Sequence, residues 1–163
     1  MITAAHCVHS YPADVWTVAI GEQNSHSKEE HEQFIGVEEI IKHPDYKFPK
    51  FIYDLALIRL KEKASWTKYA QPVCLPSVNS RTGRGLGYLA GWGYDAESKR
   101  GGTPTEDLHM ARLPIMENEQ CQEWFHSQGK RITLQPEHLC AGHEQGQEDG
   151  CQVIFLCLIQ PRN

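Results

Sequence analysis

The sequence has no apolar run long enough to cross a membrane. Its longest uninterrupted apolar stretch covers residues 153–159, whereas a transmembrane helix needs roughly 18 or more such residues. The amino terminus lacks a basic segment followed by a long apolar one, which is the pattern of a secretory signal. We therefore expect neither a membrane span nor a signal peptide in this chain.

Positive charge is scarce and scattered. The 16 Lys and Arg residues are outnumbered by 21 Asp and Glu residues, and the formal net charge is -5. No basic cluster of the kind that binds nucleic acid is visible. Hydrophobic residues make up 40% of the 163 residues and charged residues 23%, which is typical of one globular domain.

Helical periodicity is almost absent. Short apolar or alternating runs, separated by Gly, Pro, Asn and Asp, predict strands over residues 15–20, 34–41, 55–60, 87–92 and 110–115. A short helix is predicted only where Cys121, Trp124 and Phe125 share one face, with Asn118 as its N-cap and Gly129 as its stop. The pattern indicates an all-β chain.

Six cysteines are many for a reduced cytosolic protein of this size, and no pair has the CxxC spacing of a zinc site. They indicate an oxidising compartment, although the chain carries no export signal. We therefore expect the chain to begin inside a longer, secreted parent protein.

Three short motifs follow one another along the chain. Thr3-Ala4-Ala5-His6-Cys7 is followed 48 residues after the histidine by Asp54-Leu55-Ala56-Leu57-Ile58-Arg59-Leu60, and then by Gly91-Trp92-Gly93. Together these motifs resemble the chymotrypsin/trypsin family of serine proteases, over residues 1 to about 152. The resemblance implies a double six-stranded antiparallel β-barrel, incomplete at both termini, with residues 153–163 as an unrelated apolar tail.

The resemblance makes His6 and Asp54 catalytic. An imidazole that titrates near neutral pH can take a proton from a nucleophile, and a carboxylate on its other ring nitrogen fixes the tautomer. The simpler alternatives are a structural histidine and a solvated acid before a strand. We expect Leu55, Leu57 and Leu60 to draw Asp54 into apolar surroundings.

The catalytic serine is missing. Glu148-Asp149-Gly150-Cys151-Gln152 is similar to the segment that precedes this serine, and the resemblance makes Asp149 the acid that binds Arg or Lys of a substrate. An acidic surface turn is the alternative. Where the family continues with Gly-Asp-Ser-Gly-Gly-Pro, this chain has Val-Ile-Phe-Leu-Cys-Leu at residues 153–158.

The resemblance also pairs cysteines. It joins Cys121 to Cys140, leaves the partners of Cys7 and Cys151 beyond the chain ends, and implies an upstream regulatory chain tethered through Cys74. Cys157 lies in the tail.

Residues 21–35 match without a gap the calcium loop of trypsin-like enzymes. Oxygen ligands suit a hard cation, and the resemblance takes them from the carboxylates of Glu22, Glu29 and Glu32 and the carbonyls of Asn24 and Ser27. A solvated acidic loop is the alternative, and His26 and His31 leave a transition metal open.

These features imply a fragment of a secreted endopeptidase that cleaves proteins or peptides after Arg or Lys. As written, the chain should be inactive because it has no nucleophile. Two alternatives stay open, a non-catalytic homologue that acts as a binding or regulatory protein, and a nonfunctional product of an aberrant transcript.

Overall fold

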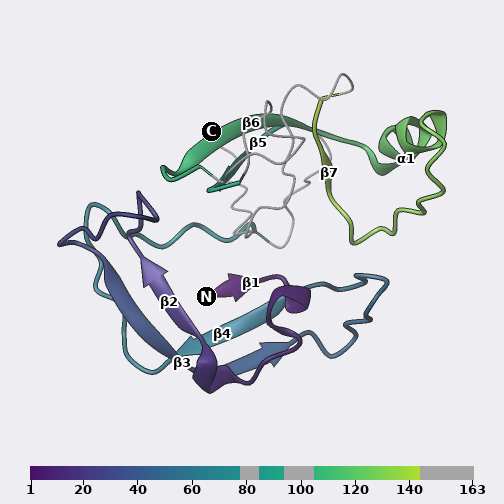
Figure 1. Cartoon of the computed structure of the whole chain (residues 1–163). Helices are drawn as coiled ribbons and strands as arrows, with labels where there is room; N and C mark the ends of the chain where they lie inside the picture. Colours follow the sequence, from purple (N-terminus) through teal and green to yellow (C-terminus); the bar gives the residue numbers. More distant parts are fainter. Residues whose placement is uncertain (78–84, 94–104, 144–163) are drawn as a thin grey trace.

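The computed structural model describes residues 1–77, 85–93 and 105–143. Within these residues the chain forms two antiparallel sheets and a single α-helix (Figure 1). The strands are β1 Ile2–Thr3, β2 Thr17–Ile20, β3 Gln33–Lys42, β4 Ala56–Leu60, β5 Gly85–Gly91, β6 His109–Met116 and β7 Cys140–Ala141. The helix α1 covers Asn118–Ser127, and two 3₁₀ turns cover η1 Ala5–Val8 and η2 Ala13–Val15. The predicted all-β character is confirmed.

The first sheet has the strand order β1-β4-β3-β2. Its long strand β3 has two partners, since residues 33–36 pair with β2 and residues 37–42 pair with β4. The register shifts between Val37 and Glu39, and the two consecutive residues Glu38 and Glu39 are both exposed. An extra residue of this kind bends and twists a strand, so β3 curls where it passes from one partner to the other.

A small apolar cluster fixes η1 on the sheet. Ala5, Val8 and Ala56 are almost fully buried, with 0%, 4% and 1% of their surface exposed. Trp16 and Tyr46 pack around them. The turn that follows β1 is therefore held against the first residue of β4.

The second sheet has the order β5-β6-β7. Strands β5 and β6 pair from Gly85 opposite Ile115 to Gly91 opposite His109. Leu113 and Ile115 are buried beneath this pairing. Beyond β6 the chain enters α1, and a disulfide from Cys121 returns to β7.

The two sheets lie one above the other and are joined at one side by the loop after β2 (Figure 1). The carbonyl of Gln23 accepts the backbone N–H of Leu108 at 2.8 Å and the indole N–H of Trp92 at 3.2 Å. The side-chain amide of Asn24 donates to Asp107 at 2.8 Å. The loop after β2, which carries the acidic residues of the expected calcium site and is called the acidic loop below, thus contacts both halves of the fold.

Most predicted elements occur with small shifts in their bounds. Val15 lies in η2 rather than in β2, because the N–H of Trp16 turns back to the carbonyl of Ala13. Asn118 is the first residue of α1 and not its N-cap, since its amide donates to the carbonyls of Gln135 and His138 instead of to the helix. The two-residue strands β1 and β7 were not predicted.

Candidate active site

His6 and Asp54 are brought together by strand pairing. β1 and β4 pair with Thr3 opposite Ala56, so the turn after β1 and the residues before β4 share one end of the sheet. Nδ1 of His6 lies 2.5 Å from Oδ2 of Asp54, and the backbone N–H of His6 donates to Oδ1 at 2.8 Å. One carboxylate thus fixes both the backbone and the ring of the histidine.

The two partners differ in exposure. The side chain of His6 is 39% exposed and that of Asp54 18%. The rings of Phe51 and His6 form a T-shaped contact, with 5.3 Å between ring centres. The acid is therefore more shielded than the base, and a partly exposed imidazole can exchange a proton with a reacting group.

The partial burial of Asp54 has a different cause from the one expected. Leu55 and Leu57 are 45% and 48% exposed, so they do not enclose the carboxylate. Alternate residues of a strand face opposite sides, and β4 turns Ala56 inward. The small inward residue lets η1 approach Asp54, and the expectation based on the leucines was wrong for Leu55 and Leu57.

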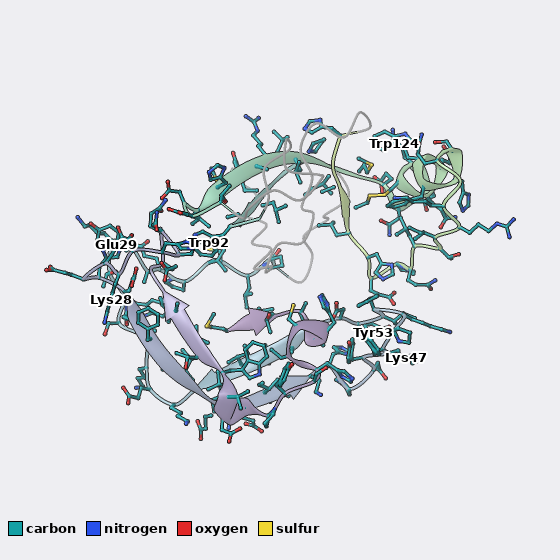
Figure 2. All side chains as sticks on the ribbon, in the orientation of Figure 1. Lys28, Glu29, Lys47, Tyr53, Trp92 and Trp124 are labelled. Atoms are coloured by element: carbon teal, nitrogen blue, oxygen red, sulfur yellow. A yellow bond between two sulfur atoms is a disulfide. The ribbon has the colours of Figure 1, made fainter. Side chains whose placement is uncertain are left out.

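The loop before Asp54 has an uncommon backbone. Phe51 and Tyr53 have φ values of 54° and 49°, in a region that residues other than glycine seldom adopt. Figure 2 shows Lys47 and Tyr53 together at one end of the first sheet, opposite the end that carries Lys28 and Glu29. Such strain is typical of functional loops, and here it places Phe51 beside the histidine.

Cys7 is a neighbour of the pair that sequence reasoning did not identify as part of the site. Its Sγ lies 3.4 Å from Nε2 of His6. The structure leaves Cys7 as a free, partly buried thiol. Its position beside His6 in the sequence was the available signal, but adjacency alone does not fix the direction of either side chain.

The acidic loop gathers three of the predicted metal ligands. Burial, followed by the negative charges of Glu32 and Glu29, raises the pKa of Glu22 above its ordinary value. One carboxylate oxygen each of Glu29 and Glu32 is buried without a hydrogen bond in the described part of the chain. Nε2 of His31 lies 3.4 Å from Glu29, and its ring stacks on Tyr69.

The loop is not arranged as a finished coordination shell. No group of three or more His, Cys, Asp or Glu side chains is set to hold a metal ion within residues 1–77, 85–93 and 105–143. The Asn24 side chain accepts the backbone N–H groups of His26 and Ser27, and the Asn24 carbonyl also accepts from Ser27. Calcium binding by this loop stays a prediction.

The structure describes only some of the remaining predicted residues. It joins Cys121 to Cys140, which the resemblance pairs, and Cys74 is an exposed free thiol. Asp149 and Cys151, like the tail from residue 153, lie outside the described residues.

A pocket lies beside α1, away from the histidine. It has a volume of about 470 Å³, and its lining includes Met116, Gln120 and Trp124 of β6 and α1. Neither His6 nor Asp54 lines it. The close contact of His6 with Asp54 defines the candidate site better than this cavity, because catalytic groups act at hydrogen-bond distance.

No helix in the described part of the chain has the length and apolar character to cross a membrane.

Comparison with known proteins agrees with the geometry. The family model named Trypsin matches residues 1–152. Serine proteinase stubble of Drosophila melanogaster is 32% identical over 152 residues, which is 92% of this chain and 19% of that protein. Coagulation factor XI of Bos taurus is 34% identical, over 93% of this chain and 24% of that protein. Granzyme E of Mus musculus is 36% identical, over 87% of this chain and 53% of that protein.

The chain thus spans from about a fifth to about half of these relatives. Its two curled antiparallel sheets fit the double β-barrel that the motifs implied. The match covers both His6 and Asp54 and extends well beyond half of the sequence. The chain belongs to the trypsin family of serine proteases.

Proposed function

We propose that this chain is the part of a serine endopeptidase that supplies the general base and its orienting acid. The single observation that supports this most is the double contact of Asp54 with the ring and the backbone of His6. Since Asp54 holds Nδ1, Nε2 is the ring nitrogen that would take the proton of a hydroxyl nucleophile. The substrates would be proteins or peptides cleaved after Arg or Lys, which Asp149 would bind through charge-assisted hydrogen bonds.

The fragment proposal has a direct genetic test. Sequencing the transcript across the codon for Gln152 should reveal a Gly-Asp-Ser continuation in another frame or exon. Its absence from every frame and neighbouring exon would remove the support for an active parent enzyme. In that case the second candidate, a non-catalytic homologue that binds partners, would take its place, since the printed sequence has Val153 after Gln152.

A chain with this sequence is expected to show no peptidase activity. His6 has no hydroxyl in the family's context to activate, and the backbone amides around the missing serine would have formed the oxyanion hole. Arg and Lys peptide amides should therefore be hydrolysed no faster than with His6→Ala, between roughly pH 6 and 9, where imidazole bases act. Turnover that disappears in His6→Ala would contradict this.

We further propose that the acidic loop binds calcium. The buried carboxylate oxygens of Glu29 and Glu32 without hydrogen bonds support this, because such acceptors gain most from a cation. The carboxylate of Glu22 and the carbonyls of Asn24 and Ser27 would complete the ligand set. Bound calcium would neutralise the charge at this loop and stabilise it.

Calcium at 100 times its Kd should stabilise the folded chain by about 2.7 kcal/mol. The melting temperature should rise accordingly. Because the pKa of Glu22 is raised in the folded chain, deprotonation destabilises the fold as the pH rises through that value. The gain from calcium should therefore be larger at neutral than at mildly acidic pH. Glu32→Gln should abolish it, whereas Glu30→Gln, an exposed loop residue, should not. An equal rise in both variants would exclude this site.

The cysteines suggest where the parent protein works. The bridge between Cys121 and Cys140 needs an oxidising compartment to persist. We infer that the parent is secreted and that the exposed Cys74 ties the domain to an upstream chain. Non-reducing and reducing electrophoresis of the parent protein, with and without Cys74→Ser, would test this tether.

A further inference from the structure

His43 contacts the chain on both sides of the predicted catalytic acid. It directly follows β3, and its backbone N–H donates to the carbonyl of Leu55, one residue after Asp54, at 2.8 Å. Its ring stacks on the ring of Tyr53, one residue before Asp54, with 4.7 Å between ring centres and 10° between the ring planes. One residue therefore holds both neighbours of the acid.

The backbone before Asp54 needs such a hold. Tyr53 has a φ of 49°, in the left-handed region that a residue with a Cβ atom disfavours. The N–H of Leu55 donates back to the carbonyl of Tyr53 at 2.7 Å, so the chain turns tightly around Asp54. A strained conformation of this kind persists only where surrounding contacts impose it. The stack of His43 on Tyr53 is a contact that can do so.

The His43 ring makes two contacts, and they differ in how easily water replaces them. Its Nδ1 accepts the backbone N–H of Asp45 at 3.1 Å. Asp45 is exposed, so water can satisfy this N–H when the imidazole is removed. Water cannot replace the flat face that the ring presents to Tyr53. The stack is thus the contact through which the side chain acts on the turn.

The turn positions the acid against its base. Asp54 accepts the backbone N–H of His6 at 2.8 Å and contacts Nδ1 of the same residue. Both contacts use one carboxylate, so a backbone rotation at Tyr53 would displace both together.

We propose that His43 is a positioning residue, which holds Tyr53 in its strained conformation by ring stacking and thereby holds Asp54 against His6. A small displacement of such a pair is enough to impair catalysis. The inference rests on the proposed role of His6 and Asp54 as base and acid, but its test needs no peptidase activity.

The test measures hydrogen exchange of the His6 amide by NMR in the full chain, because this N–H is bonded to Asp54. The reference is the amide of Val37, a buried residue of β3, which donates to the carbonyl of Trp16 at 3.2 Å. His43→Ala should raise the ratio of the His6 rate to the Val37 rate by at least about tenfold, because exchange reports local opening. A general loss of stability would raise both rates and leave their ratio unchanged.

Two further substitutions separate the ring from the hydrogen bond. His43→Phe keeps a flat ring without an acceptor, so the ratio should return to within about threefold of that of the unchanged chain. His43→Asn keeps an acceptor for the N–H of Asp45, as in an Asx turn, but it has no ring. The ratio should then stay as high as in His43→Ala. Recovery in His43→Asn, or no recovery in His43→Phe, would overturn the proposal.

His138 provides the matched control. Its Nδ1 accepts the backbone N–H of Gln135 at 2.9 Å, in the second half of the fold. His138→Ala removes an imidazole that makes the same kind of hydrogen bond, and it should leave the ratio unchanged. An unchanged ratio in His43→Ala, or an equal rise of the ratio in His138→Ala, would contradict a specific role of His43.

A measurement on the unchanged chain keeps the proposal testable if the variants do not fold. Nuclear Overhauser effects should connect the ring protons of His43 with those of Tyr53, since the two ring centres are 4.7 Å apart. Their absence would overturn the proposal. The transcript test across the codon for Gln152 concerns the proposed function alone, because its outcome does not depend on His43.

Discussion

Removal of the disulfide between Cys121 and Cys140 is expected to destabilise the second half of the fold by roughly 3 kcal/mol, the value for a loop of this size. The two cysteines are 19 residues apart, and Cys121 is 3% exposed on the inner face of α1. Without the bridge, α1 is held to the following loop mainly by the amide of Asn118 and by Gln122, which accepts the N–H of Leu134.

Urea denaturation followed by circular dichroism would measure this loss in the double variant Cys121→Ala/Cys140→Ala. Both cysteines are changed together so that neither is left as a reactive thiol. Cys74→Ala is the matched control, because Cys74 is exposed and unbridged. A double variant within about 0.5 kcal/mol of the unchanged chain, as for a neutral surface substitution, would contradict the prediction.

Ala56→Leu is expected to have the second large effect, a loss of about 1–3 kcal/mol, because extra methylene groups strain a well-packed core. Ala56 is 1% exposed and packs directly against Ala5 and Val8 of η1. A larger side chain would push η1 away from β4. His6 follows Ala5 and Asp54 lies two residues before Ala56, so the same displacement would separate the base from its acid.

Two measurements would check both parts of this expectation. Urea denaturation gives the loss of stability, and the NMR signals of the His6 imidazole give the loss of its contact with Asp54. Ala19→Leu is the control, since Ala19 is exposed on β2 and contacts neither residue of the pair. A similar loss of stability in both variants would show that the tight contact between Ala56 and η1 does not limit the site.

The sequence was sufficient for the longer strands and for the pairing of His6 with Asp54, because local alternation and motif order carry that information. It did not show which side of β4 is buried. Leu55 and Leu57 face one way and Ala56, Ile58 and Leu60 the other. Both sides carry leucine or isoleucine, and Arg59, on the side of Leu55 and Leu57, is the single charged residue among them. The alternation therefore favours one orientation only weakly, and packing against η1 decides between them.

The contacts of Cys7 and Tyr46 were out of reach for a similar reason. Tyr46 lies 39 residues after Cys7 in sequence, and no local pattern indicates that both side chains pack against the cluster of Ala5, Val8 and Ala56. The strands β1 and β7 were missed because two residues are too few to show a period. Each depends on a partner strand elsewhere in the chain.

The strand order of the first sheet has a consequence for the rigidity of the dyad. Asp54 lies two residues before β4, which has neighbours on both sides, whereas His6 follows β1, an edge strand with two paired residues. Edge segments with few backbone pairings open at lower free energy than central strands. We therefore expect the acid, next to a central strand, to be held more firmly than the base, whose side of the sheet should open first.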